Sequence, residues 1–173
     1  MTKSNLHECF LDIFEKNIGI IIKIARAYTK TTQDREDLIN DIALELWKSF
    51  ERFKGDSKLS TWIYRVALNT ALNYNRKRKG VRFISFGESK LFIDSNWLTE
   101  PDHSSQSDML YDCINELNAL NKAILLLYLD GNSYDEISTI TGISKTNVGT
   151  RIGRSKEQIK TLVIKKNQNY GTD

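Results

Sequence analysis

The chain has 173 residues and a formal net charge of +3, a length that holds one ordinary domain or two small helical ones. A single proline among abundant Leu, Ile, Lys and Asn favours helices, and two cysteines are too few for a disulfide framework or a zinc site. No apolar run approaches the roughly 20 residues that span a bilayer, and no signal-peptide core begins the chain, so we expect a cytoplasmic protein without membrane insertion. We also expect no metal and no cofactor.

Two stretches in the first 53 residues repeat apolar side chains at helical spacing. The first predicts a helix over residues 6–28. The second predicts a helix over residues 35–53, whose apolar positions are spaced by four: Leu38, Ile42, Leu46 and Phe50. Acidic residues crowd the start of this second helix, where the positive end of the helix dipole favours them.

A loop from Lys54 to Ser60 leads to a third predicted helix, over about residues 61–79. One stripe of this helix is expected to be buried: Ile63, Ala67, Thr70 and Tyr74. The adjacent stripe combines an aromatic ring for stacking, amides for base edges and cations for phosphate: Trp62, Arg65, Asn69, Asn73 and Arg76. The sequence leaves open a core position for Trp62, structural hydrogen bonds for the two asparagines, and a solvated helix end for the basic run that follows.

Residues 80–107 have the composition of a linker, because they hold Gly80, Gly87, the only proline and a polar cluster at 103–107. A C-terminal helical unit is expected over residues 108–166.

Within that unit, residues 133–156 are typical of two short helices joined by a tight turn. Ser133 and Glu136 predict a capping box, Gly142 predicts the end of the first helix, and Ser144 predicts the cap of the second. Apolar side chains are expected to hold the pair together: Ile137, Ile140, Ile143, Val148 and Ile152. The outer side of the second helix carries groups suited to bases and phosphates: Thr146, Asn147, Thr150, Arg151, Gly153 and Arg154. An ordinary helical hairpin is the alternative.

Two glycines inside this second helix, Gly149 and Gly153, each cost about 1 kcal/mol relative to alanine. Close approach of the helix to DNA is one explanation. The other is that a small residue is needed against a neighbouring helix.

Charge is unevenly distributed along the chain. The net charge is zero over residues 1–60, +6 over 61–82, −8 over 83–140 and +5 over 141–173. Two basic blocks separated by an acidic one are what a protein that holds DNA at two places needs.

Three blocks resemble the extracytoplasmic-function (ECF) class of bacterial sigma factors, the small two-domain members of the sigma-70 group. The blocks are residues 34–47, 53–78 and 125–156, which stand in the family's order and at its spacing. The resemblance implies an all-α fold with two small helical domains joined by a flexible linker, the C-terminal domain containing a helix-turn-helix. It implies these boundaries: sigma region 2 at 1–80, an acidic linker at 81–107, sigma region 4 at 108–166 and a tail at 167–173.

The resemblance also implies a transcription initiation factor rather than an enzyme. Its implied partners are promoter DNA, the beta and beta-prime subunits of core RNA polymerase, and an inhibitory anti-sigma factor. Contacts with core polymerase are implied at Asp37, Asn40, Asp41 and Glu45. Contacts with the minus-ten element are implied at Lys58, Ser60, Trp62, Arg65, Asn69, Asn73, Arg76, Lys77, Arg78 and Lys79, with the loop 55–60 taking a flipped-out base. Contacts with the minus-thirty-five element are implied at Ser144, Lys145, Thr146, Asn147, Thr150, Arg151, Arg154 and Lys156.

The sequence departs from the family pattern at three places in the C-terminal unit. Family members usually have Leu-Pro where this chain has Leu117 and Asn118, arginine where it has Lys122, and alanine where it has Ser138. None of these changes removes a DNA-contacting group, so we expect effects on local stability alone.

Two other functions remain open at this point. A regulator with a sensory N-terminal domain would explain residues 108–166 but would not need the first basic block. A metal-dependent nuclease would use a set of acids as ligands: Asp34, Glu36, Asp37 and Asp41.

Overall fold

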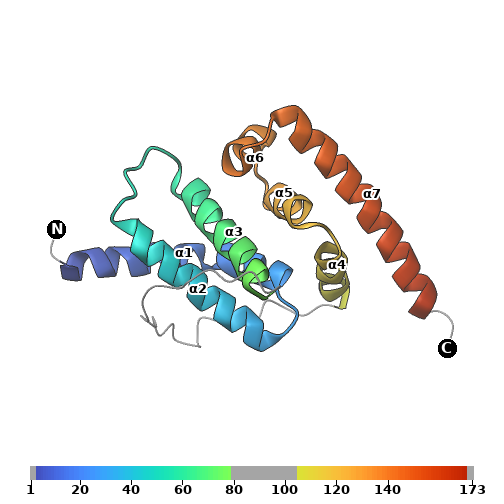
Figure 1. Ribbon diagram of the computed structural model, residues 1–173, viewed down its shortest axis with the longest axis horizontal. Coiled ribbons are helices and arrows are strands. Elements are labelled where there is room, and N and C mark those ends of the chain that lie inside the picture. Colours follow the sequence, from blue (N-terminus) through green and yellow to red (C-terminus); the bar gives the residue numbers. More distant parts are fainter. Residues whose placement is uncertain (1–2, 79–104, 171–173) are drawn as a thin grey trace. The chain divides into compact units, whose positions relative to one another are not determined.

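The computed structural model describes residues 3–78 and 105–170, which form seven α-helices and no β-strand (Figure 1). The helices form two compact units, α1–α3 and α4–α7, drawn in blue to green and in yellow to red. The all-α fold with two small helical domains is therefore confirmed. The expected flexible linker lies outside the described residues except at its end, where α4 begins at Ser105.

The first unit consists of α1 (Lys3–Tyr28), α2 (Thr32–Phe50) and α3 (Leu59–Arg78), and each helix packs against the other two. The three predicted helices are present. Helix α2 begins earlier than expected because the Thr31 side chain caps it, accepting a hydrogen bond from the backbone N–H of Asp34 at 3.1 Å.

The core of the first unit draws on all three helices. Its fully buried side chains include Ile21 and Ile24 of α1 and three of the four residues in the predicted apolar stripe of α2, whereas the fourth, Phe50, is half-buried. The predicted buried stripe of α3 is only partly right. Ile63 and Ala67 are buried, whereas Thr70 and Tyr74 are half-buried, and the buried surface extends instead through Tyr64, Leu68 and Ala71. Helix α3 contacts both α1 and α2, so its buried face is wider than one stripe.

The second unit consists of α4 (Ser105–Asn115), α5 (Ala119–Leu129), α6 (Tyr134–Thr141) and the long α7 (Lys145–Tyr170). Helix α7 packs against each of the other three helices. Their shared core contains fully buried side chains from every helix: Ile114, Ile124, Leu127, Ile137, Val148 and Ile152.

The three departures from the family pattern are each accommodated locally. Asn118 caps α5, since its side chain accepts a hydrogen bond from the backbone N–H of Asn121 at 2.9 Å. The buried Lys122 donates from Nζ to Oδ1 of Asn115 at 3.2 Å. Ser138 donates from Oγ to the backbone carbonyl of Ile143 at 2.6 Å. Each replacement thus brings a polar contact of its own.

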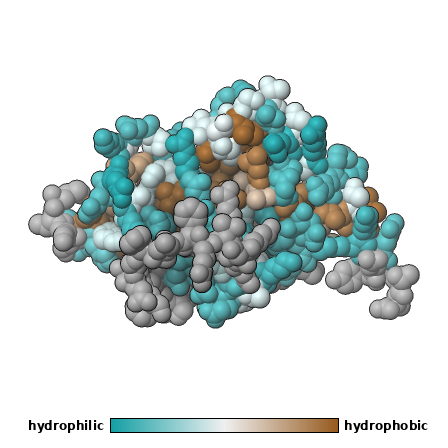
Figure 2. Space-filling model, in the orientation of Figure 1, coloured by the Kyte–Doolittle hydropathy of each residue, from teal (hydrophilic) through white to brown (hydrophobic). Residues whose placement is uncertain are grey.

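Hydrophilic residues cover most of the visible face of the described residues, with smaller apolar patches between them (Figure 2). Within the described ranges, no helix has both the length and the apolar character required to cross a membrane.

Candidate polymerase and nucleic-acid interfaces

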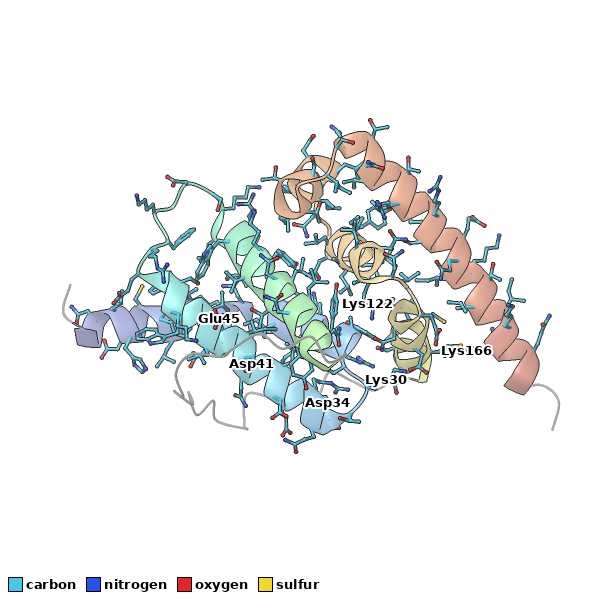
Figure 3. All side chains as sticks on the ribbon, viewed as in Figure 1. Lys30, Asp34, Asp41, Glu45, Lys122 and Lys166 are labelled. Atoms are coloured by element: carbon cyan, nitrogen blue, oxygen red, sulfur yellow. The ribbon has the colours of Figure 1, made fainter. Side chains whose placement is uncertain are left out.

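The outer face of α2 gathers the four residues expected to contact core polymerase. Asp37, Asp41 and Glu45 follow one another at intervals of one helical turn, with Asn40 beside them, and all four are exposed. Figure 3 shows Asp41 and Glu45 along this helix. The Glu45 carboxylate pairs with Nζ of Lys48 at 2.9 Å. The result is an exposed acidic stripe opposite the buried side of α2.

The outer face of α3 presents the polar stripe expected to contact the minus-ten element. Arg65, Asn69 and Asn73 are exposed, and the indole of Trp62 is half-buried at the start of the stripe. Lys58 is exposed just before α3, and Ser60 is half-buried in its first turn. Arg76, Lys77 and Arg78 continue the helix without described side chains, and Lys79 lies outside the described residues. The first unit therefore has an acidic stripe on α2 and a basic and amide-bearing stripe on α3.

A hollow of about 580 Å³ lies where the end of α2, the loop 51–58 and the start of α3 meet. This volume is in the range of sites that take small organic ligands. Two aromatic side chains and four cations line much of it, beside the carboxylates of Glu45 and Asp56: Phe53, Trp62, Lys48, Arg52, Lys54 and Arg65. Gly55 has a φ of 78°, a left-handed conformation that favours glycine and turns the loop. The hollow therefore combines a flat aromatic surface with an excess of positive charge.

Trp62 meets both descriptions that its sequence context left open. Its ring lies 4.9 Å from the ring of Phe53 and 6.2 Å from that of Phe50, so it packs within an aromatic cluster. The same half-buried side chain lines the hollow. The cluster holds the indole in place while leaving part of it accessible.

Several residues of the hollow were not singled out from the sequence. Lys48, Arg52, Phe53 and Lys54 come from the end of α2 and from the loop, and only the fold brings them beside Trp62. The one sequence signal was the alternation of cation, aromatic ring and cation at residues 52–54.

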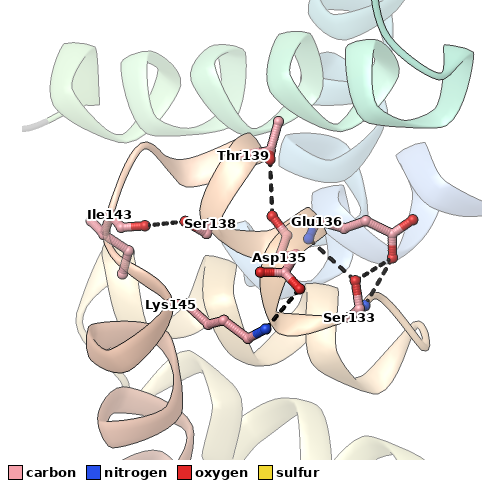
Figure 4. A network of polar contacts seen from close by, with 7 residues as sticks. All are labelled: Ser133, Asp135, Glu136, Ser138, Thr139, Ile143 and Lys145. Carbon is pink, nitrogen blue, oxygen red and sulfur yellow. Dashed lines mark hydrogen bonds and ion pairs between the residues drawn. The ribbon is translucent and has the colours of Figure 1, made fainter.

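The predicted helix-turn-helix is confirmed in α6 and α7 (Figure 4). The expectation of two short helices holds for α6 alone, because α7 continues to Tyr170 and has 26 residues. The backbone N–H of Ser133 donates to Oε2 of Glu136 at 2.9 Å, and the backbone N–H of Glu136 donates to Oγ of Ser133 at 3.2 Å, which completes the capping box. Gly142 ends α6 with a φ of 76°. Ser144 caps α7 by accepting from the backbone N–H of Asn147 at 3.3 Å. The bond from Ser138 to Ile143 spans the turn between the helices.

The first turns of α7 expose most of the groups expected to contact the minus-thirty-five element. Seven of the eight are exposed: Ser144, Lys145, Thr146, Asn147, Thr150, Arg154 and Lys156. Gly153, on the outer side of the same helix, is exposed as well.

Three cations of this surface contact other parts of the second unit. Lys145 pairs with Oδ2 of Asp135 at 2.7 Å. Arg151 is half-buried and donates from Nη1 to Oδ1 of Asn121 at 2.7 Å. Lys156 donates from Nζ to the hydroxyl of Tyr128 at 2.9 Å, and its Nζ lies 4.2 Å from the centre of that ring.

The two glycines of α7 lie in different surroundings. A Cβ at Gly149 would lie 3.3 Å from Cε2 of Tyr134, at the start of α6, so a larger residue here requires the Tyr134 ring to shift by a few tenths of an ångström. Among the described residues, a Cβ at Gly153 would meet no heavy atom within 4 Å outside the adjoining backbone of its own helix. Packing inside the unit therefore gives no reason for Gly153.

The nuclease alternative requires acidic, histidine or cysteine side chains that are grouped to bind a metal ion. Across residues 3–78 and 105–170, no group of three or more His, Cys, Asp or Glu side chains is arranged to hold a metal ion. The proposed nuclease ligands thus form no such cluster there.

Cys9 is exposed and Cys113 is buried, and burial raises the pKa of the Cys113 thiol.

Comparison with known protein families assigns a class to each unit. Residues 13–81 match the description "Sigma-70 region 2", and residues 107–159 match "Sigma-70, region 4". The two helical units are therefore the two domains of a sigma-70-type factor.

Individual relatives narrow the class. The ECF RNA polymerase sigma-E factor of Escherichia coli (strain K12) is 32% identical over 141 residues, which span 75% of this chain and 74% of that protein. The sigma-E factor of Haemophilus influenzae is 29% identical over 155 residues, 82% of each chain. This chain belongs to the ECF family of RNA polymerase sigma factors, as its three sequence blocks predicted.

Two solved structures share the fold. The chain superposes on the sigma factor RpoE, solved in complex with the anti-sigma factor NepR from Bartonella quintana, with a TM-score of 0.69 and 19% identity over 90% of this chain and 97% of that one. It also superposes on a structure of CnrH in complex with the cytosolic domain of CnrY, with a TM-score of 0.65 and 18% identity over 91% and 88% of the two chains.

Proposed function

We propose that this ECF sigma factor divides promoter recognition among three exposed surfaces, one for core polymerase and two for DNA. It acts without chemistry of its own, in the cytoplasm, by changing where core polymerase binds and whether the DNA opens there. The hollow beside Trp62 carries this proposal, because it offers single-stranded DNA a kind of contact that a duplex cannot use.

The acidic stripe on α2 is the proposed contact with the clamp of core polymerase. Its members all lie on one exposed face, so a single basic surface on the partner can contact them together. Electrostatic complementarity of this kind accelerates association and selects the partner.

The outer face of α3 and the adjoining hollow are the proposed site of promoter opening. Displacing a base from the stack costs on the order of a few kcal/mol. A protein without nucleotide hydrolysis offsets this cost only by binding the opened strand better than the duplex. A flipped-out base entering the hollow would stack on Trp62, while Arg65 and the loop cations contact its phosphates. Asn69 and Asn73 offer amides to neighbouring base edges.

The start of α7 is the proposed reader of the minus-thirty-five element. A capped helix with exposed threonine, asparagine and arginine side chains fits the major groove, where each base pair has its own pattern of donors and acceptors. This contact fixes the register of the polymerase on the duplex, whereas the first unit acts on separated strands.

Control by an anti-sigma factor is also part of the proposal. One structural relative was solved with an anti-sigma factor and another with a cytosolic domain. Their likeness in fold to both units of this chain suggests a comparable inhibitory partner here.

Transcription from core polymerase tests the proposal. We expect core enzyme to start transcripts at specific promoters only when this chain is added, and permanganate to detect unpaired thymines near the minus-ten element. Trp62→Ala with Arg65→Ala should reduce permanganate reactivity while duplex binding persists. Lys16→Ala is the matched control, because Lys16 is exposed on α1 and its ion pair among the described residues is with Asp12 of its own helix.

One result would reject this function, and another would reject the role given to the hollow. A chain that binds duplex DNA but gives no initiation with core enzyme would be a regulator of the alternative class. Unchanged permanganate reactivity in the double variant would show that the hollow takes no part in opening the DNA strands.

A further inference from the structure

We propose that contacts with α5 divide the polar side chains of α7 into two groups: Arg151 and Lys156, held by Asn121 and Tyr128, bind phosphates, while Asn147 and Arg154 read base edges. This inference deepens the proposed function and rests on it. Asn121 and Tyr128 become positioning residues that touch no DNA themselves.

Arg151 has a restricted side chain. Its Nη1 donates to Oδ1 of Asn121 at 2.7 Å, its Nε is buried without a hydrogen-bond partner among the described residues, and the whole side chain is half-buried. A guanidinium held at one end, with one donor enclosed, cannot turn its fork freely toward a base edge. The guanidinium still places a full positive charge at the surface of α7, which is what a phosphate contact requires.

Lys156 is restrained on another flank of the same helix. Its Nζ donates to the Tyr128 hydroxyl at 2.9 Å and lies 4.2 Å from the ring centre. An ammonium keeps further N–H donors and its whole charge in such a contact, because the tyrosine is neutral. Holding the flexible lysine stem in advance reduces the conformational entropy lost when a phosphate binds.

Both restraints come from one helix. Asn121 and Tyr128 are seven residues apart in α5, which is two helical turns, so they lie on the same side of it. Helix α5 packs against α7 through its apolar side and holds a cation of α7 near each of its ends. Lys145 differs, because its partner Asp135 is a carboxylate that cancels its charge.

Asn147 and Arg154 differ from these cations. Both are exposed, and neither side chain has a hydrogen bond within the described part of the chain. They are seven residues apart in α7 and share a side of it. Asparagine and arginine form the bidentate pairs with adenine and guanine, which need both side-chain donors or acceptors available. An unrestrained side chain meets that condition.

The test uses holoenzyme assembled from core polymerase and the full chain, with duplexes that the wild-type holoenzyme selects from a random-sequence pool. We expect Arg151→Ala and Lys156→Ala each to lower the slope of log affinity against log salt by about one unit, with the selected sequence unchanged. Asn147→Ala and Arg154→Ala should each relax base preference at one or two positions of the selected sequence.

The positioning residues should give a different signature. Asn121→Ala and Tyr128→Phe leave every charge in place, so we expect roughly two- to tenfold weaker binding at an unchanged salt slope. Tyr128→Phe keeps the ring and removes only the hydroxyl. Adding Asn121→Ala to Arg151→Ala should cause no further loss. Thr161→Ala is the matched control, because Thr161 is exposed on α7 and its side-chain hydrogen bond among the described residues is to the backbone carbonyl of Glu157 in the same helix.

Thermal unfolding of each variant separates a positioning role from a folding defect. The inference is overturned if Arg151→Ala changes the selected sequence, if Asn121→Ala binds as well as wild type, or if the losses from Asn121→Ala and Arg151→Ala add. Failure of the wild-type holoenzyme to select any sequence would instead reject the proposed function on which the inference rests.

Discussion

Replacing Gly153 with alanine should change stability and DNA binding in opposite directions. Because a Cβ at this position meets no heavy atom of a neighbouring element within 4 Å in the described part of the chain, alanine adds no steric cost there. It recovers the helix propensity that glycine lacks, about 1 kcal/mol. For a domain of fewer than 100 residues, that gain raises the unfolding temperature by roughly 4–8 °C. The added methyl group lies on the exposed face of α7, so we expect about fivefold weaker binding of the minus-thirty-five duplex.

Gly149→Ala is the matched comparison in the same helix. Alanine gains the same propensity there, but its Cβ would lie 3.3 Å from Cε2 of Tyr134 and the ring must move. We therefore expect a net gain below about 0.5 kcal/mol. Calorimetry on the full chain measures the unfolding temperatures, and fluorescence anisotropy of the holoenzyme with labelled duplex measures affinity.

Two results would contradict this reasoning about Gly153. If the unfolding temperature of Gly153→Ala is no higher than that of Gly149→Ala, the open surroundings of Gly153 do not determine the stability of the variant. If Gly153→Ala is more stable and binds DNA as well as wild type, close approach to DNA is not the reason for this glycine.

Three further predictions concern side chains of the second unit, the last of them with Cys9 of the first unit as its reference. Ser138→Ala should cost about 0.5 kcal/mol in denaturant unfolding, since losing the bond to Ile143 costs about 1 kcal/mol and alanine's helix propensity recovers part of it; a more stable variant would contradict this balance. Ser155→Ala should instead stabilise the unit by about 1 kcal/mol, because the Ser155 hydroxyl is fully buried with no hydrogen-bond partner among the described residues. A less stable variant would mean that the hydroxyl makes a favourable contact in the folded protein. Near about pH 8, a thiol reagent should modify Cys9 promptly and Cys113 only after unfolding, because burial raises the pKa of Cys113 and blocks access; two equal rates would argue against that burial.

The sequence was sufficient for features that depend on neighbouring residues. The capping box at Ser133, the left-handed Gly142 and the cap at Ser144 were predicted and are present, because each depends on contacts within a few residues. Helix periodicity likewise located the predicted helices. The exposed faces of α2 and α3 follow from the same periodicity, and the contacts assigned to their residues stay predictions.

Features that depend on distant residues were not predictable in this way. Arg151 lies 30 positions from Asn121, and no local pattern reveals that one restrains the other. Lys48 and Trp62 line the same hollow only because the end of α2 lies against the start of α3 in the folded unit. The width of the buried face of α3 was underestimated for the same reason, since it depends on two packing partners.

Each unit is built around a core drawn from its own helices, α1–α3 in one and α4–α7 in the other. The free energy of promoter discrimination should therefore split into two nearly additive contributions, one from each unit. Selection can adjust the upstream half of a promoter preference without disturbing the downstream half. A hybrid chain that pairs either domain with the complementary domain of a relative should inherit one preference from each parent.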